Sequence, residues 1–401
     1  MNILADKKKI QIITEYFYPV VGGMELNILN TSKHLVEDGW NVAVFTTKNN
    51  RDQKNVLKDR AKIYGIVVKR KPYFSYAYSP FSLGVNYHSS GVICLANLSV
   101  RPGIFVLLYA LFLKIFGWKK FILIFSSHGQ FGQSLKVHPS IEFFLKSIIE
   151  KTIGVFLINS VVDGIHAVSE TEKNKLIKAG IKSILITVIK NGVDEDAYKY
   201  EQEQFLKPET KDLVKNLGDY ILQVGRIERI KNFESVVKAL PHIDAKINFA
   251  ILGPDENRKY KNEILALVDE LNLGHRVHFL GSVTGLAKYY LMRRAKIVTQ
   301  MSISEGFGST LYEAMTQGCV CIVSKNTALE ELIKDGVNGF CVPATDYLKL
   351  AEKINFILEK SDKNLLTKMG NANITLTKDK SWRNIATELS RFYIGYLNSE
   401  K

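Results

Sequence analysis

Residues 220–240 of this chain read YILQVGRIERIKNFESVVKAL. The run 220–224 is short and apolar, as in a buried strand, and 232–240 has the spacing of an amphipathic helix. The loop between them carries two cations, Arg226 and Lys231. A buried strand, a polar loop and a helix, in this order, form the repeating unit of a parallel sheet that helices cover on both faces.

The same alternation recurs along the chain. Apolar runs typical of strands are found at 10–14, 41–46, 92–95, 121–125, 164–168 and 183–189, and again at 220–224, 248–252, 278–280, 297–300 and 320–323. Helical spacing is found at 25–38, 104–116, 232–240, 262–271 and 309–316. A charged stretch, 194–219, separates the two series, and we predict little regular structure in it.

We therefore predict an α/β protein of two doubly wound, Rossmann-like domains that face each other across a cleft. Residues 1–202 would form the first domain and residues 203–381 the second, with a linker near 194–210. Ligands of such sheets bind at the carboxyl ends of the strands, so the functional side chains should lie on loops that follow strands.

The composition excludes several classes of protein. In 401 residues, 46% are hydrophobic and 23% charged, which excludes a disordered, collagenous or coiled-coil chain. Four cysteines, at 94, 319, 321 and 341, form no C-x-x-C pair and no zinc-binding spacing, so we expect reduced thiols in a cytosolic compartment. The apolar run after the lysines at 7–9 is too short for a secretory signal, which also favours a cytoplasmic protein.

The most apolar stretch, 104–116, reads IFVLLYALFLKIF. A membrane-spanning helix needs about 20 apolar residues, and extending this stretch brings in Gly117, Lys119 and Lys120. A buried helix followed by a strand is the favoured interpretation. A helix lying on a membrane surface and a true membrane span remain as alternatives.

Two loops of the second half carry candidate binding residues. Arg226 and Lys231 precede a helix start, where cations and free amides suit a diphosphate. The second loop, 304–315, reads SEGFGSTLYEAM. Its glycines let the backbone approach a ligand, and Glu305 and Glu313 are good acceptors for sugar hydroxyls. Taken singly, an exposed basic loop and helix-terminal or exposed glutamates are the better explanations.

The first half has two weaker signals, and both follow strands. Gly22 and Gly23 form a turn that does not match the dinucleotide pattern G-x-G-x-x-G, although a ligand could still pack against its backbone. His128 follows the run 121–125 and would lie at the same edge of the sheet. A single histidine is more often a structural hydrogen-bonding residue than a catalyst.

Taken in order, these motifs resemble glycosyltransferase family 4, the retaining enzymes of the GT-B fold also described as glycosyl transferases group 1. The matching segments are PVVGGME (19–25), SHG (127–129), VSE (168–170), NGVD (191–194), VGRIERIK (224–231), ILG (251–253), FLG (279–281), EGFGSTLYE (305–313) and DGVNGF (335–340). Each alone is a weak match. The ordered set, with seven residues between the two glutamates, is specific and covers most of the chain.

The resemblance implies a transferase that moves a hexose from a nucleoside-diphosphate sugar, such as a UDP-sugar or GDP-sugar, to an acceptor hydroxyl. Arg226 and Lys231 would bind the donor diphosphate, and Glu313 the ribose hydroxyls. Glu305 and the backbone of Gly306, Phe307 and Gly308 would contact the transferred sugar. Gly22 and Gly23 would approach the phosphates from the acceptor-binding domain, and His128 would face the reacting centre. A helix within 382–401 would cross back to that domain.

By the same resemblance, the new bond keeps the donor's anomeric configuration and no metal or other cofactor is expected. A competing motif, D-x-D at 194–196, is the metal-holding signature of the other large glycosyltransferase fold. It lies in the expected linker, and Arg226 with Lys231 could neutralise a diphosphate instead. The chain departs from the family at Met301-Ser302, where Pro-Ser is frequent, and at Asn232, where glycine is frequent.

Two other classes stay open. One is a non-catalytic protein that binds nucleotide sugars, and the other is an epimerase on the same fold. Retention of both cations and both glutamates argues against the first, and the two-glutamate element argues against the second. Release of a nucleoside diphosphate only in the presence of an acceptor would distinguish transfer from either.

The net charge of +14, from 54 basic and 40 acidic residues, predicts an anionic partner. No Asp or Glu occurs between Asp59 and Glu142, an interval with ten basic residues and an aromatic run at 73–81. Cations beside aromatics suit an anionic membrane surface, and no nucleic-acid-binding motif is found. We therefore predict a cytoplasmic, peripheral membrane enzyme that uses a glycan or lipid-linked acceptor in polysaccharide, lipopolysaccharide or glycolipid assembly. A basic surface without any partner is the alternative.

Overall fold

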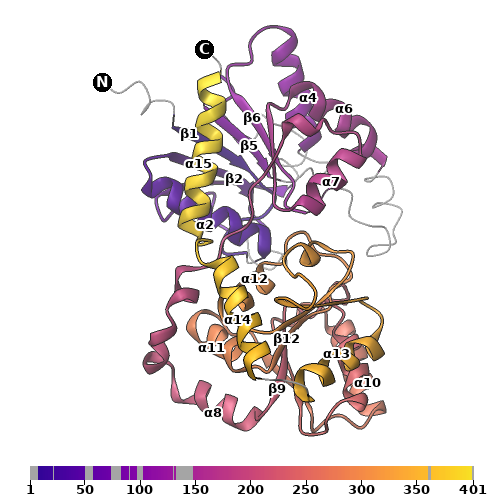
Figure 1. Ribbon diagram of the computed structural model, residues 1–401. Helices are drawn as coiled ribbons and strands as arrows, with labels where there is room; N and C mark the ends of the chain where they lie inside the picture. The colour runs from indigo at the N-terminus through magenta and orange to yellow at the C-terminus, as the bar shows by residue number, and fades with distance from the viewer. Residues whose placement is uncertain are drawn as a thin grey trace. The chain divides into compact units, whose positions relative to one another are not determined.

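The computed structural model describes residues 8–20, 22–49, 57–73, 83–89, 91–96, 103–129, 131, 148–359 and 363–399. The chain divides into two units, Met1–Gly192 with Trp382–Lys401, and Val193–Ser381. Each unit has one sheet with helices on both faces, as the alternation of apolar runs and helical spacing predicts (Figure 1).

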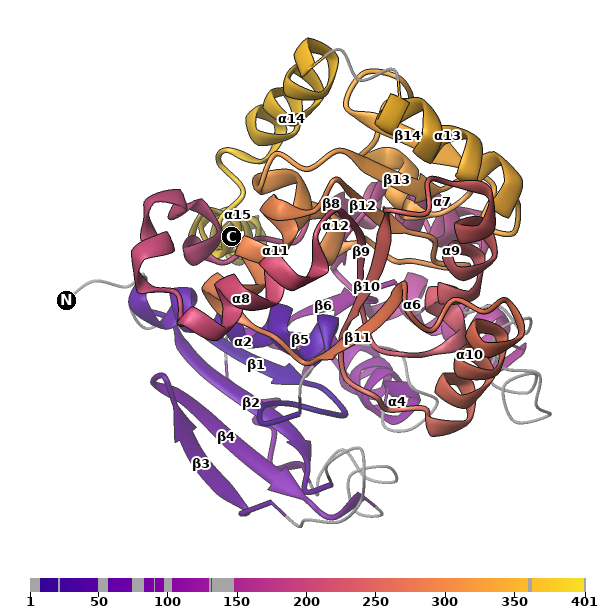
Figure 2. The same cartoon turned by 90° about the horizontal axis from the view of Figure 1, so that it is seen from below.

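The sheet of the first unit has eight strands in the order β3-β4-β2-β1-β5-β6-β7-β8. Their bounds are β1 Lys9–Ile13, β2 Asn41–Thr47, β3 Arg60–Ile63, β4 Ile66–Lys71, β5 Val92–Ala96, β6 Ile122–Ser126, β7 Gly164–Ala167 and β8 Ile186–Val188. All neighbours are parallel except β3 and β4, which form an antiparallel hairpin at the edge (Figure 2). Tyr64 and Gly65 turn this hairpin with positive φ angles of 47° and 82°.

Helices cover both faces of this sheet. They are α2 Gly23–Glu37, α4 Gly103–Ile115, a π-helical turn Glu150–Gly154 that continues into α6 Val155–Val161, α7 Glu170–Lys178 and α15 Trp382–Ser399. On one face α2 packs beside α15, and Trp40 donates a hydrogen bond to Ser390 at 2.9 Å. On the other face α4 packs beside α6. The helix near the C-terminus therefore belongs to the first unit.

The second unit has a six-stranded parallel sheet in the order β11-β10-β9-β12-β13-β14. Its strands are β9 Tyr220–Val224, β10 Asn248–Leu252, β11 Val277–Gly281, β12 Ile297–Gln300, β13 Cys321–Ser324 and β14 Gly339–Val342. Its helices are α8 Pro208–Leu217, α9 Phe233–Ala239, α10 Arg258–Glu270, α11 Gly285–Arg294, α12 Ser309–Thr316, α13 Tyr347–Glu359 and α14 Lys363–Thr377.

The domain boundary differs from the expected one. It lies between Gly192 and Val193, not between 202 and 203, and the expected linker near 194–210 belongs to the second unit. This stretch is also more regular than expected, with 3₁₀ turns at Glu195–Tyr198 and Tyr200–Phe205 followed by α8. Side-chain hydrogen bonds to the second unit hold the first of these turns. The Tyr198 hydroxyl donates to the Thr377 carbonyl at 2.7 Å, and Gln317 donates to the Ala197 carbonyl.

Within the described part of the chain, none of the helices combines the length and the hydropathy that crossing a membrane requires.

Candidate functional site

The two motif-bearing loops of the second unit leave the carboxyl ends of neighbouring strands. β9 and β12 pair in parallel with Ile221 opposite Ile297. The chain passes from β9 to β10 and β11 on one side, and then returns to β12, β13 and β14 on the other. The strand order therefore reverses between β9 and β12. In open α/β sheets such a switch point is where ligands bind.

Glycines let three strand ends lie close together at this edge. The Gly225 amide donates to the Leu252 carbonyl, and the Gly253 amide to the Gly281 carbonyl, both at 2.9 Å. A Cβ on Gly253 would lie 1.9 Å from the Gly225 carbonyl oxygen, so no other residue fits there. The glycine of the ILG motif is therefore needed for the approach of the neighbouring loop that carries Gly225.

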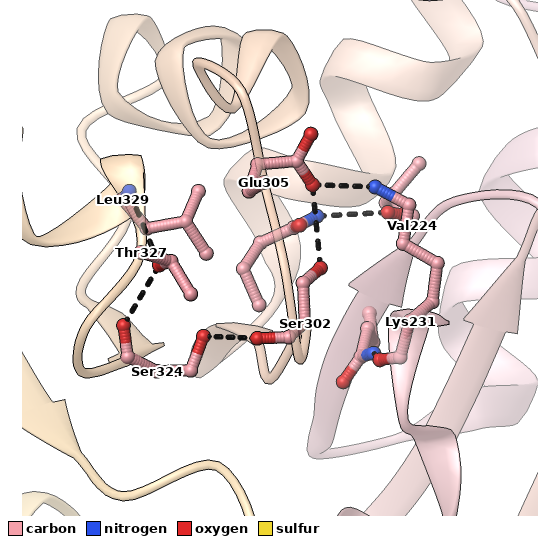
Figure 3. A network of polar contacts seen from close by, with 9 residues as sticks. Val224, Lys231, Ser302, Glu305, Ser324, Thr327 and Leu329 are labelled. Atoms are coloured by element: carbon pink, nitrogen blue, oxygen red, sulfur yellow. Dashed lines mark hydrogen bonds and ion pairs between the residues drawn. The ribbon is translucent and has the colours of Figure 1, made fainter. Parts of the chain in front are cut away.

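The Lys231 and Glu305 side chains meet at the switch point. The Nζ atom of Lys231 lies 2.6 Å from Oε2 of Glu305 (Figure 3). The side chains are only 17% and 19% exposed, which strengthens the electrostatic attraction over that of a surface pair. The Lys231 stem runs past Gly225, where an added Cβ would lie 3.4 Å from its Cδ. A cation and a carboxylate are thus brought together from two loops that are far apart in sequence.

A chain of hydrogen bonds holds the loop that carries Glu305 (Figure 3). The Ser302 hydroxyl donates to Oε2 of Glu305 at 3.3 Å, and the Ser324 hydroxyl donates to the Ser302 carbonyl at 2.6 Å. The Thr327 hydroxyl donates to the Ser324 carbonyl at 3.0 Å and accepts from the Leu329 amide. Met301-Ser302 stands where the family often has Pro-Ser, and Ser302, in the serine position, contacts the carboxylate.

The glycine-rich segment 306–308 leads into α12. Gly308 has a φ of +95°, and a Cβ there would lie 2.3 Å from a Leu329 methyl carbon, so glycine is required on two grounds. Phe307 is buried, and its ring packs edge-on against Tyr312 with the centroids 5.1 Å apart. The Phe307 side chain is therefore part of the core, and its backbone is the part available to a ligand.

The backbone conformation at Asn232 explains why asparagine can stand where the family often has glycine, the second departure from the family pattern. Asn232 has a φ of +53° and a ψ of 51°, a left-handed conformation that glycine and asparagine adopt more readily than other residues. Its side-chain amide donates to the carbonyls of Met301 and Ala344 at 3.0 and 2.7 Å. Asn232 therefore preserves the turn after Lys231 and ties it to the loop after β12.

Arg226 and Glu313 do not contact the Lys231–Glu305 pair. The Arg226 guanidinium donates to Glu228 at 2.7 Å and to Glu256 at 3.1 Å. Glu313, in α12, accepts from Lys288 of α11 at 2.7 Å, and both side chains are mostly buried. Arg226 and Glu313 thus each pair with an opposite charge within the second unit. The sequence did not predict these partners, Glu228, Glu256 and Lys288, as part of the site.

Gly22 and Gly23 lie in the first unit, where α2 begins. Gly22 has extended backbone with a φ of −166°, and the Leu26 amide donates to its carbonyl at 2.9 Å. A Cβ on Gly23 would meet no atom within 4 Å. Packing among the described residues therefore does not require glycine at 23, and the predicted approach of a phosphate to these residues stays a prediction.

His128 lies in a tight turn after β6 and joins a histidine pair. Its φ is +46°, and its Nε2 atom lies 3.1 Å from the Ser126 hydroxyl. That hydroxyl also lies 3.0 Å from Nδ1 of His166, whose Nε2 contacts the Ile189 carbonyl. Burial, and then the neighbouring His166, lower the pKa of His128 to about 3, and burial lowers the pKa of His166 to about 4. Both rings are therefore neutral near pH 7.

A buried carboxylate, Glu172, holds this turn in place. It accepts hydrogen bonds from the Ser127 hydroxyl and the Gly129 amide on one oxygen, and from the Val168 amide at 2.6 Å on the other. Burial raises the pKa of Glu172, and these hydrogen bonds oppose that rise. Glu172 thus fixes the two residues that flank His128.

We predict that Glu172→Gln lowers the free energy of unfolding by about 1–3 kcal/mol. All three groups donate hydrogen bonds to the Glu172 carboxylate. A glutamine side chain has only one oxygen, so its NH₂ group would face a backbone N–H and could not accept from it. The measurement is urea unfolding followed by circular dichroism. Glu170→Gln, at an exposed position of the same helix, is the matched control and should change stability little. Equal stabilities of the two variants would contradict the assignment.

The sequence contains a partial signal for Glu172. Ser169 and Glu172 have the S-x-x-E spacing of a helix N-terminus, and the Ser169 hydroxyl does accept from the Glu172 amide at 3.0 Å. The pattern predicts where α7 begins. It does not show that the carboxylate reaches the turn after β6, because that contact depends on β6 and β7 lying side by side.

The D-x-D triplet is engaged in contacts within the second unit. Asp194 accepts from the Tyr289 hydroxyl at 3.1 Å, and Asp196 pairs with Lys199 at 2.7 Å. Among the described residues, no group of three or more His, Cys, Asp and Glu side chains has the arrangement of a metal site. The expectation that no metal is needed stays a prediction.

Two family models match the chain in succession. "Glycosyltransferase Family 4" matches residues 21–197, and "Glycosyl transferases group 1" matches residues 207–375. Together they span most of both units, in the order that the motifs predict. The chain belongs to glycosyltransferase family 4. Its two doubly wound units have the GT-B fold, and the solved structures that match the chain have the same fold.

One curated relative and two solved structures illustrate the similarity. The chain is 23% identical to N-acetyl-alpha-D-glucosaminyl L-malate synthase of Bacillus anthracis over 88% of each protein. Sucrose-phosphate synthase from Thermosynechococcus elongatus matches with a TM-score of 0.77 and 20% identity, covering 98% of this chain and 99% of that one. Anabaena HepE, solved with UDP and glucose, matches with a TM-score of 0.72 and 20% identity over 96% and 98%.

Proposed function

We propose that this family 4 glycosyltransferase moves a hexose from a nucleoside-diphosphate sugar to an acceptor hydroxyl with retention of the anomeric configuration. The observation that carries the proposal is the Lys231–Glu305 pair at the switch point of the second sheet. HepE, a protein of similar fold, was solved with UDP-glucose, which favours a UDP-sugar as the donor.

Each residue of the site then has a chemical role. The Lys231 ammonium stabilises negative charge on the departing diphosphate, and Arg226 adds a second cation on the same loop. The Glu305 carboxylate accepts hydrogen bonds from hydroxyls of the transferred sugar, and the amides of the segment 306–308 donate hydrogen bonds to the sugar oxygens. The Glu313 carboxylate accepts hydrogen bonds from the ribose hydroxyls. His128, neutral at pH 7, accepts or donates a hydrogen bond at the reacting centre.

We also propose that transfer needs no metal ion, because two cations follow β9 and the carboxylates of the D-x-D triplet are engaged elsewhere. The acceptor would be a glycan or a lipid-linked phosphate at the cytoplasmic face of the membrane. Assembly of a cell-surface polysaccharide, lipopolysaccharide or glycolipid would require such a reaction. The carboxylate-free interval 60–141 supports an anionic acceptor or surface.

A turnover assay tests the proposal. The purified protein is incubated with a panel of nucleotide sugars, with and without extracts that contain lipid-linked glycans, and released nucleoside diphosphate is measured. We expect release that depends on the acceptor and is unchanged in EDTA. Loss of transfer in EDTA, restored by manganese, would refute metal independence. Binding without turnover would favour a non-catalytic protein, and interconversion of the donor sugar would favour an epimerase.

A further inference from the structure

Helices α4 and α6 of the first unit, with the residues just after α4 and the π-helical turn before α6, expose a set of large apolar side chains. The residues are Phe112, Ile115, Phe116, Trp118, Ile153 and Phe156, and we call them the α4–α6 face. Ile115 is 70% exposed and Phe156 64%. Single exposed apolar residues are ordinary on protein surfaces, but a contiguous group usually marks an interaction site.

The group is contiguous because the two helices pack together. α4 lies beside α6 (Figure 1), and the Lys114 ammonium donates to the Ser160 carbonyl of α6 at 2.7 Å. On the α4 side the rings touch one another. The Phe112 and Phe116 centroids are 4.7 Å apart, and those of Phe116 and Trp118 are 5.4 Å apart.

The opposite side of α4 fills the core. Val106, Leu107, Ala110 and Leu113 are almost completely buried under the sheet. The strongly apolar stretch therefore divides into one stripe that stabilises the fold and a second stripe that the fold leaves in contact with solvent. This second stripe explains why the stretch is more apolar than packing on one sheet requires.

The exposed, unpaired charges that the described residues place around the face are positive. Lys114, Lys120 and Lys151 are exposed, and Lys119 pairs with Asp163 at 2.5 Å. Among residues 103–129, 131 and 148–163, the other carboxylate is Glu150, which is buried. The face therefore combines aromatic rings and lysines with no exposed, unpaired carboxylate in these segments.

We propose that the α4–α6 face docks on a membrane surface that carries anionic lipid. Tryptophan and lysine together are typical of membrane interfaces, where rings enter the headgroup region and ammonium groups meet phosphates. Protein–protein interfaces are instead depleted in lysine. The docking rests on exposed apolar side chains and their charge, so it does not depend on the proposed transfer reaction.

The aromatic run at 73–81, which the sequence also places on a membrane surface, lies mostly outside the described residues. The surface assigned here is a different one, and it corresponds to the alternative of a surface-lying helix for 104–116. A helix of 13 residues cannot span a bilayer but can lie in its interface.

Trp118 gives a readout specific to this face. The chain has three tryptophans, and Trp40 and Trp382 are buried whereas Trp118 is 54% exposed. The full-length protein is mixed at low salt with vesicles of phosphatidylcholine alone or with added phosphatidylglycerol. We expect co-sedimentation and a blue shift of tryptophan emission with the anionic vesicles, and weaker binding at high salt. Trp118→Phe should lose the shift and still sediment.

The variant Phe112→Ser/Phe116→Ser/Trp118→Ser should bind the anionic vesicles at least about tenfold more weakly, because three rings no longer leave water. Leu348→Ser/Leu376→Ser removes exposed apolar side chains from the second unit and should bind as the parent does. Circular dichroism checks that each variant is folded.

Three results would overturn the proposal. The first is no preference for anionic over neutral vesicles at low salt. The second is sedimentation without any change in the emission of Trp118, which would place the contact elsewhere. The third is a parent protein that does not bind vesicles and is a dimer in analytical ultracentrifugation, while the triple variant is a monomer. In that case a second copy of the chain would cover the face.

Discussion

Replacing Lys231 with alanine is expected to lower turnover by about a hundredfold or more, the size of effect seen when one preorganised charge-stabilising donor is removed from an active site. The ammonium is mostly buried and lies 2.6 Å from Glu305, so neither water nor a neighbouring side chain can replace it well. The measurement is kcat from nucleoside-diphosphate release at saturating donor.

Lys238→Ala is the matched control, because Lys238 is an exposed lysine of α9 in the same unit and should leave kcat unchanged. Thermal unfolding of both variants checks the fold, since removing Lys231 leaves Glu305 without its cation. A folded Lys231→Ala variant with a near-normal kcat would show that Lys231 does not stabilise the leaving diphosphate.

Replacing Glu305 with glutamine is the second large effect, a loss of more than about tenfold in turnover. Glutamine keeps the size of the side chain but removes the charge that attracts Lys231 and the Ser302 hydroxyl. Steady-state kinetics give kcat and KM for the variant, and Glu359→Gln, at an exposed position of α13, is the control. An unchanged kcat would contradict a role for Glu305 at the transferred sugar.

The double variant separates two explanations for the Glu305 effect. If Glu305 acts mainly by orienting Lys231, then Lys231→Ala/Glu305→Gln should be no slower than Lys231→Ala alone. If Glu305 also binds the sugar directly, the two losses should partly add. The proposed contact of Glu305 with the sugar requires the second result.

The spacing of apolar residues predicts most of the parallel strands of both sheets and several of the helices that cover them, but not β14 at the edge of the second sheet. β3 and β4 were not predicted. They form the edge hairpin of the first sheet. Arg60 and Lys62 take the exposed positions of β3, and β4 ends in Lys69-Arg70-Lys71, so neither strand has the continuous apolar run of a central strand. The predicted domain boundary at 202/203 differs from the observed one between Gly192 and Val193. The polar composition of residues 194–210 does not show which of the two sheets this segment packs against.

At the site, the motifs predict the residues but not their partners. The order of strand, loop and helix predicts that Arg226, Lys231 and Glu305 follow strands, and the structure places all three on such loops. The pairing of Lys231 with Glu305 requires β9 and β12 to be neighbours, which depends on the strand order. The contacts of Arg226 with Glu256, and of Glu313 with Lys288, also join segments that are distant in sequence.

The sequence alone determined the fold class, the family and the chemical types at the site, because apolar periodicity and motif spacing are local properties that the chain carries in any conformation. The tertiary structure decided which charges meet, which side chain holds the His128 turn, and which side of α4 remains exposed. These depend on strand order and helix packing, and they arise only when residues that are far apart in the chain come within a few ångströms of one another.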